Sequence, residues 1–299
     1  MPSPERSGGL RNLLNWITKS RSNSPSRRIL TPHLRVLELE DRRVLSAVPA
    51  AYLSAARELV ISAASRANDG QDDTFVVQRH GDDLQVSVNG QNAFTGPLDD
   101  VSRIRIEGSD DRDVLYLDYS SGDPLPRDGA VFHAGNSHGN ASDAIVLLGG
   151  TLTSPLERVT HQFIDLGEGR VRIDGADRLG QSAATLDYTG VETILDAGRS
   201  KHLVFRDDRT GESLTLTGDA ANGPMQFVSS GGPTVMFDTP NQSLTVAASV
   251  IDLQGAIRGA QLDVELYAQD DLRISGTIDV SDLAPGQRGG VIRATAERI

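Results

Sequence analysis

The C-terminal segment, residues 243–299, repeats a short pattern with a period of about 20 residues, and this repeat strongly narrows the folds open to the chain. Its first two units match at two places: Leu244-Thr245-Val246-Ala247-Ala248 matches Val264-Glu265-Leu266-Tyr267-Ala268 at a spacing of 20, and Leu253-Gln254-Gly255-Ala256-Ile257 matches Ile274-Ser275-Gly276-Thr277-Ile278 at a spacing of 21. A third unit begins at Val291, 27 residues after Val264. One coil of a parallel β-helix requires such a period, because each coil must present apolar residues inward at matching heights.

We therefore expect residues 243–299 to be the first coils of a right-handed parallel β-helix. A leucine-rich repeat has a similar period but would need Leu-x-x-Leu-x-Leu with Asn, which this segment lacks. In the same register Leu272 of the second unit corresponds to Ile299 of the third, so the sequence stops within a coil. Natural solenoids cover such an end, because it exposes strand edges and apolar core. The chain is expected to continue into further β-helix repeats in a longer protein.

From Thr74 onward the sequence is a succession of short strands separated by turns. The clearest apolar or alternating runs are 75–77, 84–88, 104–106, 114–117, 145–148, 171–173, 203–205, 214–216 and 244–246. Gly, Asn, Asp or Pro bounds each run, as at Asn89-Gly90, which is typical of strands and tight turns. No window after residue 70 keeps a helical period over three turns. We expect an all-β body, and leave open whether the acidic module 71–242 shares the solenoid or forms a separate sandwich.

The net charge of −12 is unevenly distributed along the chain. Residues 1–50 carry a charge of +5 and residues 51–299 carry −17. An acidic body repels nucleic acid, so DNA and RNA are not expected as partners. The absence of Cys excludes disulfides and thiolate metal sites. No run of 18 apolar residues occurs, so no transmembrane helix is expected.

Residues 1–70 read as a basic leader that precedes the acidic body. Its first 35 residues are rich in Ser, Arg and Pro and cannot bury enough apolar surface to become ordered. Within this mostly disordered leader, apolar residues at helical spacing predict a short basic helix over about 10–18. A second short helix is expected over 51–66.

Two acidic turns are candidate calcium sites. Gly108-Ser109-Asp110-Asp111-Arg112-Asp113-Val114-Leu115 fits half of a calcium-binding nonapeptide, with Asp113 and Leu115 in register. Ser109 and Asp111 stand where that motif needs Gly, and no tandem copy adjoins it. The second turn, 140–145, also lacks the glycines. Because calcium needs six to eight oxygens from several turns, solvated loops are the favoured interpretation, and Ca²⁺ stays open as a ligand.

Two other groups could carry chemistry. His133 and His138 flank a short loop, but further ligands at a usable spacing are lacking, which favours a surface loop over a metal site. Some parallel β-helices are polysaccharide lyases or glycosidases that use Asp pairs and a basic residue, and Asp110, Asp111 and Asp113 with Arg112 could take that role. A chain with 41 acidic residues forms such groups by chance. No catalytic, cofactor-binding or metal-binding residue is therefore assigned.

The leader carries a recognisable motif. Residues 37–47, Leu-Glu-Leu-Glu-Asp-Arg-Arg-Val-Leu-Ser-Ala, resemble the Leu-Glu-x-Arg-x-Leu-Leu-Ser-Ala segment near the start of many large planctomycete surface and secreted proteins. Val44 stands where those leaders often have Leu. The resemblance implies export to the cell envelope or beyond and implies no chemistry.

The body also resembles surface proteins. Gly276–Ser281 and Gly289–Ile292 are similar to coils of filamentous-haemagglutinin-type adhesins. Residues 104–115 and 186–194 resemble a module that recurs in planctomycete surface proteins. These resemblances imply a non-enzymatic, secreted or cell-surface, adhesin-like structural protein, whose partners would be cell-envelope components, polysaccharide or other surface proteins. The alternative is a carbohydrate-active β-helix enzyme acting on extracellular polysaccharide.

Overall fold

The computed structural model describes residues 50–62, 72–135, 142–150, 155–174, 183–219, 221, 223–281 and 289–298. The chain divides into two compact units, Met1–Ser46 and Ala47–Ile299. Every described residue belongs to the second unit, and the boundaries expected at residues 70 and 242 both fall inside it. The leader helix expected over 10–18 lies outside the described residues.

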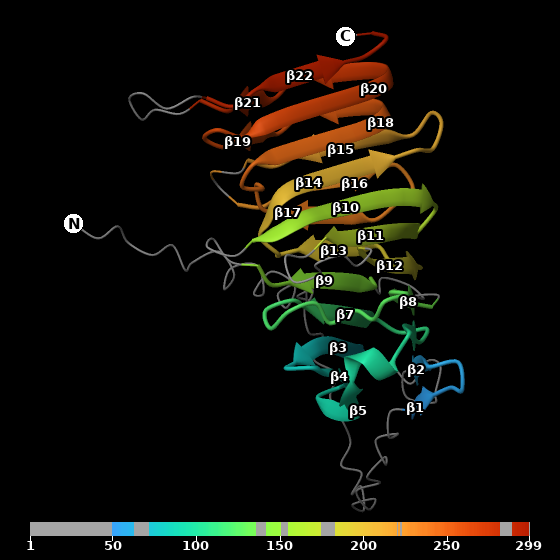
Figure 1. The fold of residues 1–299 in the computed structure, drawn as a ribbon. Coiled ribbons are helices and arrows are strands. Elements are labelled where there is room, and N and C mark those ends of the chain that lie inside the picture. Colours follow the sequence, from blue (N-terminus) through green and yellow to red (C-terminus); the bar gives the residue numbers. More distant parts are fainter. Residues whose placement is uncertain are drawn as a thin grey trace, which may run out of the picture. The chain divides into compact units, whose positions relative to one another are not determined.

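The described residues form strands, turns and one short 3-10 helix, so the predicted all-β class is confirmed (Figure 1). The strands are β1 (Ala50–Leu53), β2 (Glu58–Ser62), β3 (Asp73–His80), β4 (Asp83–Val88), β5 (Gln91–Pro97), β6 (Arg103–Glu107), β7 (Asp113–Asp118), β8 (Ala130–His133), β9 (Ala144–Leu148), β10 (Leu156–Asp165), β11 (Glu168–Asp174), β12 (Ala184–Thr189), β13 (Thr193–Asp196), β14 (Ser200–Asp207), β15 (Ser213–Thr217), β16 (Met225–Ser229), β17 (Thr234–Phe237), β18 (Ser243–Leu253), β19 (Ala256–Arg258), β20 (Asp263–Ile274), β21 (Thr277–Asp279) and β22 (Ile292–Thr295). The 3-10 helix, η1, spans Leu98–Asp100. All nine runs expected as strands lie within these elements.

Twenty of these strands form one hydrogen-bonded sheet that consists of two ladders. The first ladder runs β1-β2-β6-β8-β12-β11-β10-β14-β18-β20-β22, and its pairs are parallel except at β1–β2 and on either side of β11. The second ladder runs β5-β4-β3-β7-β9-β13-β17-β16-β15-β18, with parallel pairs from β3 to β17. The long strand β18 joins the two ladders, because its first half pairs with β14 and its second half with β15.

The core lies between the two ladders and is built from columns of aligned apolar side chains. In the second ladder Phe75, Leu115, Ile145, Ile194 and Val235 occupy one register position on five successive strands, and all five are fully buried. The side chains alternate between buried and partly exposed along β6, β7 and β12, as strands with one inward face require. Each buried aliphatic side chain contributes about 1.5–3 kcal/mol. The buried apolar side chains form one continuous cluster that extends from Leu59 to Val280.

The prediction of a helix over 51–66 is wrong for residues 51–62, the part of it that the structure describes. Residues 50–53 and 58–62 form the antiparallel strands β1 and β2, with Tyr52 opposite Val60. A turn closes the hairpin: Ser54 and Glu58 are joined by a backbone hydrogen bond of 2.9 Å, and Arg57 has a φ of 63°. Strand β2 also pairs with β6, and its alternation buries Leu59 and Ile61. Pairing with a distant strand therefore overrides the local helical spacing.

The repeat of residues 243–299 is confirmed in register for its first two units. Leu244 pairs with Val264, and Leu253 with Ile274, at the expected spacings of 20 and 21. The third unit is displaced by one residue, since Val264 pairs with Ile292 rather than with Val291. The Val264 N–H donates to the Val291 carbonyl at 2.8 Å, which is the slanted bond of a parallel pair in which Ile292 lies beside Val264.

Candidate functional site

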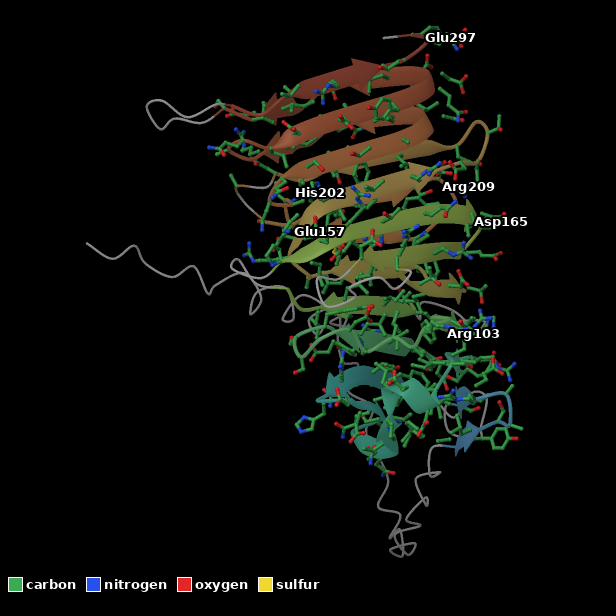
Figure 2. The ribbon with its side chains drawn as sticks, viewed as in Figure 1. Arg103, Glu157, Asp165, His202, Arg209 and Glu297 are labelled. Atoms are coloured by element: carbon green, nitrogen blue, oxygen red, sulfur yellow. The ribbon has the colours of Figure 1, made fainter. Side chains whose placement is uncertain are left out.

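The outward face of the first ladder carries rows of Arg, Asp, Thr and His side chains, and it is hollowed at two places. The strands β11, β10 and β14 supply most of the charged residues, because alternate residues of each strand face outward. In Figure 2 strand β10 crosses this face from Glu157 to Asp165, and His202 of β14 lies beside Glu157. The two hollows share Arg170 of β11.

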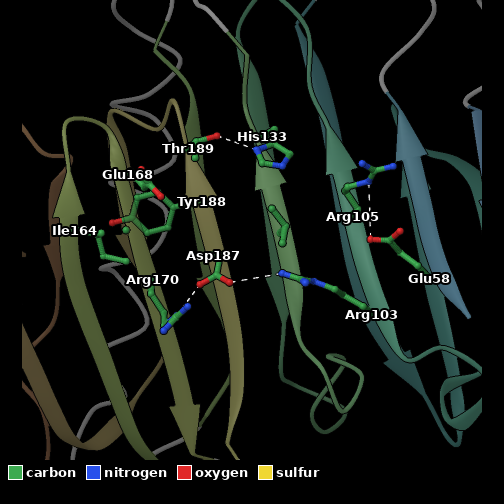
Figure 3. Close-up of a pocket in the computed structure, with 12 residues that line it drawn as sticks. Glu58, Arg103, Arg105, His133, Ile164, Glu168, Arg170, Asp187, Tyr188 and Thr189 are labelled. Atoms are coloured by element: carbon green, nitrogen blue, oxygen red, sulfur yellow. Dashed lines mark hydrogen bonds and ion pairs between the residues drawn. The ribbon is translucent and has the colours of Figure 1, made fainter. Parts of the chain in front are cut away.

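The first hollow has a volume of about 400 Å³ and is close to neutral. Its lining is Glu58, Arg103, Arg105, Val131, His133, Ile164, Glu168, Gly169, Arg170, Asp187, Tyr188 and Thr189. Asp187 lies between two cations: Arg170 Nε donates to it at 2.6 Å, and Arg103 Nη2 is 3.7 Å away (Figure 3). Hydrogen bonding to Asp187 raises the pKa of Arg170. The charges of this hollow therefore largely satisfy one another.

The second hollow, which we call the arginine hollow, has a volume of about 500 Å³ and an excess of cations. Its lining is Arg158, Thr160, Gln162, Arg170, Arg172, Asp174, Thr185, His202, Val204, Arg206, Ser243 and Thr245. The lining thus contains four guanidinium groups and one carboxylate, Asp174. Two further carboxylates beside the lining, Asp187 and Asp208, pair with Arg170 and Arg206. The remaining polar atoms are hydroxyls, one amide and one imidazole, whose Nδ1 lies 2.8 Å from Ser243 Oγ.

Each described ion pair in the arginine hollow uses only part of its guanidinium group. Arg172 contacts Asp174 through Nε at 3.4 Å, and Arg206 contacts Asp208 through Nη2 at 3.3 Å. No described carboxylate lies within ion-pair distance of Arg158. Since a guanidinium has five N–H donors, several donors on these side chains remain available to a ligand.

A column of acidic residues begins the strands of the second ladder. The pairing places Asp73 of β3 beside Asp113 of β7. The N–H of Asp113 donates to Asp143 Oδ1 at 2.8 Å, and the N–H of Asp143 donates to Glu192 Oε2 at 2.7 Å. Burial, which disfavours a charged carboxylate, raises the pKa of Asp113 to about 6 and that of Asp143 to about 7.

One polar pair lies inside the core, and a second lies at its edge. His161 Nε2 is 2.9 Å from Asp196 Oδ2, and both side chains are almost fully buried. The His161 ring stacks on Phe205 at a centroid distance of 5.1 Å. In the turn after β14, the guanidinium of Arg209 donates to the buried carboxylate of Asp207 at 2.6 Å and 2.8 Å and to Ser229 Oγ at 2.5 Å. The first pair is buried between the two ladders, whereas Arg209 of the second pair is partly exposed.

The turn considered as a candidate calcium site, residues 108–115, is held by its own protein atoms. Asp113 Oδ2 accepts the N–H of Ser109 at 2.5 Å, and Ser109 Oγ accepts the N–H of Asp111 at 3.1 Å. The carboxylate of Asp113, the residue in register with the nonapeptide motif, is therefore used to close the turn. Across the described part of the chain, no three His, Asp or Glu side chains converge as metal ligands would. Residues 140 and 141 of the second acidic turn lie outside the described residues.

The other sequence candidates are not brought together as a site. His133 faces the first hollow, where its Nδ1 lies 2.9 Å from Thr189 Oγ1, and His138 lies outside the described residues. Asp110, Asp111 and Arg112 stay on the β6–β7 turn, partly exposed, while Asp113 points into the protein. Asp113 therefore differs in burial from the two carboxylates that precede it on the turn.

Sequence reasoning missed the arginine hollow, although a signal for it exists. Arg170 and Arg172 alternate with apolar residues in Glu168–Asp174, which places both on one face of a strand. Arg158 and Arg206 are single residues of other strands, so their approach depends on the register of β10 with β11 and β14.

No protein-family model, curated protein or solved structure matches this chain. Among the described residues, no helix is long and apolar enough to span a membrane.

Proposed function

We propose that residues 47–299 are a stiff, non-catalytic scaffold of the right-handed parallel β-helix type, which works on the cell surface or outside the cell. The observation that carries the proposal is the run of parallel pairs in both ladders, together with the columns of buried side chains between them. In a solenoid each coil contacts only its neighbours, and its stability is approximately the sum of those interfaces.

Stacked corners support the β-helix proposal. The turns at Gly218, Gly255 and Gly276 lie over one another, since Ala256 N–H donates to the Gly218 carbonyl at 2.8 Å and Thr277 N–H to the Gly255 carbonyl at 3.1 Å. The short strands β19 and β21 that follow the last two corners pair in parallel. A chain that turns at the same height in each coil can add strands to both ladders repeatedly.

The charged residues on the outward face support a binding or structural role over catalysis. Glycoside hydrolysis uses two carboxyl groups on either side of the scissile bond. The arginine hollow offers only Asp174, and two of the three carboxylates of the first hollow, Asp187 and Glu58, lie beside Arg side chains. These arrangements favour the scaffold over the alternative of a carbohydrate-active enzyme.

The proposed location rests on the leader motif at residues 37–47, which resembles an export segment, and the partners would be cell-envelope components, polysaccharide or other surface proteins. Antibodies raised against residues 72–281 test the location on intact cells of the source organism. We expect surface labelling or recovery of the protein from the medium. Antigen found only after the cells are broken would contradict the proposal.

A polysaccharide assay tests the non-catalytic part. The purified full chain is incubated with polygalacturonate and alginate, and new reducing or unsaturated ends are measured. We expect none above the rate of the heat-denatured chain. Product formation that Asp187→Asn abolishes would replace the scaffold with the enzyme.

A further inference from the structure

We propose that the arginine hollow is a binding site for a linear carboxylated polysaccharide, which would lie across strands β11, β10 and β14. The site adds a ligand to the scaffold and does not depend on where the protein works. The argument rests on the charge of the hollow, on the positions of its four guanidinium groups and on the hydrogen-bonding groups between them.

The charge of the hollow is opposite to that of the chain. The lining contains four Arg and one Asp, whereas the whole chain carries −12. The side chains of Arg170, Arg172 and Arg206 are 44%, 57% and 54% exposed, so their charges face solvent. Exposed single ion pairs contribute about 0–1 kcal/mol to stability. Fold stability therefore gives little reason for gathering these four cations, and an anionic ligand gives one.

Polar side chains of β10 lie between the cations of the neighbouring strands. Thr160 and Gln162 of β10 are paired with Arg172 and Arg170 of β11. On the other side of β10, Gln162 is paired with Arg206 of β14. Neighbouring strands lie about 4.8 Å apart, so Arg170 and Arg206 stand on either side of Gln162, roughly 10 Å apart at the backbone.

Arg158 completes the arrangement at the other end of the hollow. It lies two residues before Thr160 on the same face of β10, between Asp174 and His202. The cations thus occupy several positions across three strands, and a polymer with repeated negative charges can contact more than one of them. Multiple weak contacts on one polymer strengthen binding without any single tight site.

Carboxylates fit the donors that these side chains leave available. Arg binds carboxylates through two parallel N–H donors. The carboxylates already on this face, Asp174, Asp187 and Asp208, each engage a guanidinium through one nitrogen, at Arg172, Arg170 and Arg206 respectively. The hydroxyls of Thr160, Thr185 and Thr245 are suited to the hydroxyl groups of a sugar chain.

The lining favours a polysaccharide over a nucleic acid. Single-stranded nucleic acids are bound on aromatic side chains, on which the bases stack. The residues that line the arginine hollow include no Phe, Tyr or Trp.

The experiment measures binding of the purified full chain to polygalacturonate by titration calorimetry, with neutral dextran, dextran sulfate and single-stranded DNA as comparison polymers. We expect polygalacturonate to bind more tightly than the other three, and its affinity to fall with added salt, because exposed charges are screened. Equal binding to dextran, or tighter binding to dextran sulfate or DNA, would overturn the assignment. Failure of polygalacturonate to bind would also overturn it.

Two variants locate the site. The double variant R158Q/R172Q removes two cations of the hollow and is expected to weaken binding at least about tenfold. Arg293→Gln is the matched control, because Arg293 faces outward on β22 of the same ladder, pairs with Glu265 at 2.8 Å and lies outside the hollow. It is expected to leave binding unchanged.

The thermal unfolding midpoints of both variants establish that each is folded. Binding by folded R158Q/R172Q that equals that of the native chain would overturn the site. So would an equal loss in Arg293→Gln, which would mean that the polymer contacts the face as a whole. If the double variant does not fold, the single variant Arg172→Gln replaces it, with a smaller expected loss of affinity.

Discussion

The backbone N–H of Asp113 donates a 2.8 Å hydrogen bond to the side chain of Asp143, which immediately precedes β9, the next strand of the second ladder. The carboxylate of Asp143 is fully buried, and its other oxygen has no hydrogen-bond partner among the described residues. Burial is the main reason that the pKa of Asp143 rises to about 7, and the neighbouring charges of Glu192 and Asp113 raise it further. The folded chain therefore holds a proton that the unfolded chain releases at lower pH.

Asp143 should make the protein less stable as the pH rises. Because the folded pKa lies above the ordinary value of 3.8, the stabilising contribution is complete below about pH 3.8 and is lost as the pH rises toward 7. Ionising such a carboxyl in the folded state costs roughly 4 kcal/mol. Asp143→Asn keeps the acceptor for Asp113 and cannot ionise. We expect it to unfold at a higher temperature than the native chain at about pH 8, with the difference shrinking toward about pH 4.

Asp82→Asn is the control for this comparison. Asp82 is also an acidic residue at a turn, but its side chain is fully exposed. Its substitution should shift the unfolding midpoint little, and by a similar amount at each pH. A stabilisation by Asp143→Asn that does not change with pH would mean that ionisation of Asp143 is not the cause.

Replacing one partner of the buried pair His161–Asp196 should lower the free energy of unfolding more than replacing both partners. The two side chains lie 2.9 Å apart in columns that are otherwise mostly apolar. His161→Leu leaves Asp196 Oδ2 buried without its hydrogen-bond partner, and such losses cost about 1–3 kcal/mol. The double variant H161L/D196L should recover most of this loss, because a buried hydrogen-bonded pair can be replaced by apolar side chains at little cost. Chemical denaturation of the variants measures the coupling, and a double variant as unstable as the sum of both single variants would contradict it.

Much of the fold was predictable because its signals are local. The alternation in residues 84–88 and 114–117 is visible in the sequence, and the repeat at residues 244–278 fixes two strand registers to the residue. The helix over 51–66 was wrong because β2 is stabilised by its pairing with β6, more than 40 residues away. Local spacing contains no information about such a partner.

The candidate site was less predictable than the fold for the same reason. Arg158, Arg172 and Arg206 lie on three strands, and only the register of β10 with its two neighbours brings them together. Asp113, which the sequence suggested as a calcium ligand, instead accepts the N–H of Ser109 in its own turn. The spacing of residues along the chain does not distinguish a carboxylate that binds calcium from one that accepts a backbone N–H in its own turn.

The glycine corners between the repeats should tolerate no side chain. A Cβ at Gly276 would collide with the carbonyl oxygen of Gly255, and one at Gly255 with the carbonyl oxygen of Gly218. These carbonyls accept hydrogen bonds from the next coil and cannot move freely. We expect Gly276→Ala to destabilise the protein by about 1–3 kcal/mol, measured by chemical denaturation. Gly223→Ala is the control, since a Cβ there meets nothing within 4 Å, and equal effects of the two variants would contradict the stacked corners.

Strand β2 should contribute to the core through alternate residues only. Ile61 is fully buried opposite Ala51 and beside Ile106, whereas the neighbouring Val60 is only partly buried and faces outward. Ile61→Ala should therefore cost about 2–5 kcal/mol, and Val60→Ala, a similar loss of apolar atoms on the same strand, should cost under about 1 kcal/mol. Chemical denaturation of both variants gives the two values. In a strand the cost of substitution should alternate, with large losses at Leu59 and Ile61 and a small loss at Val60 between them. Equal losses at all three residues would contradict the hairpin.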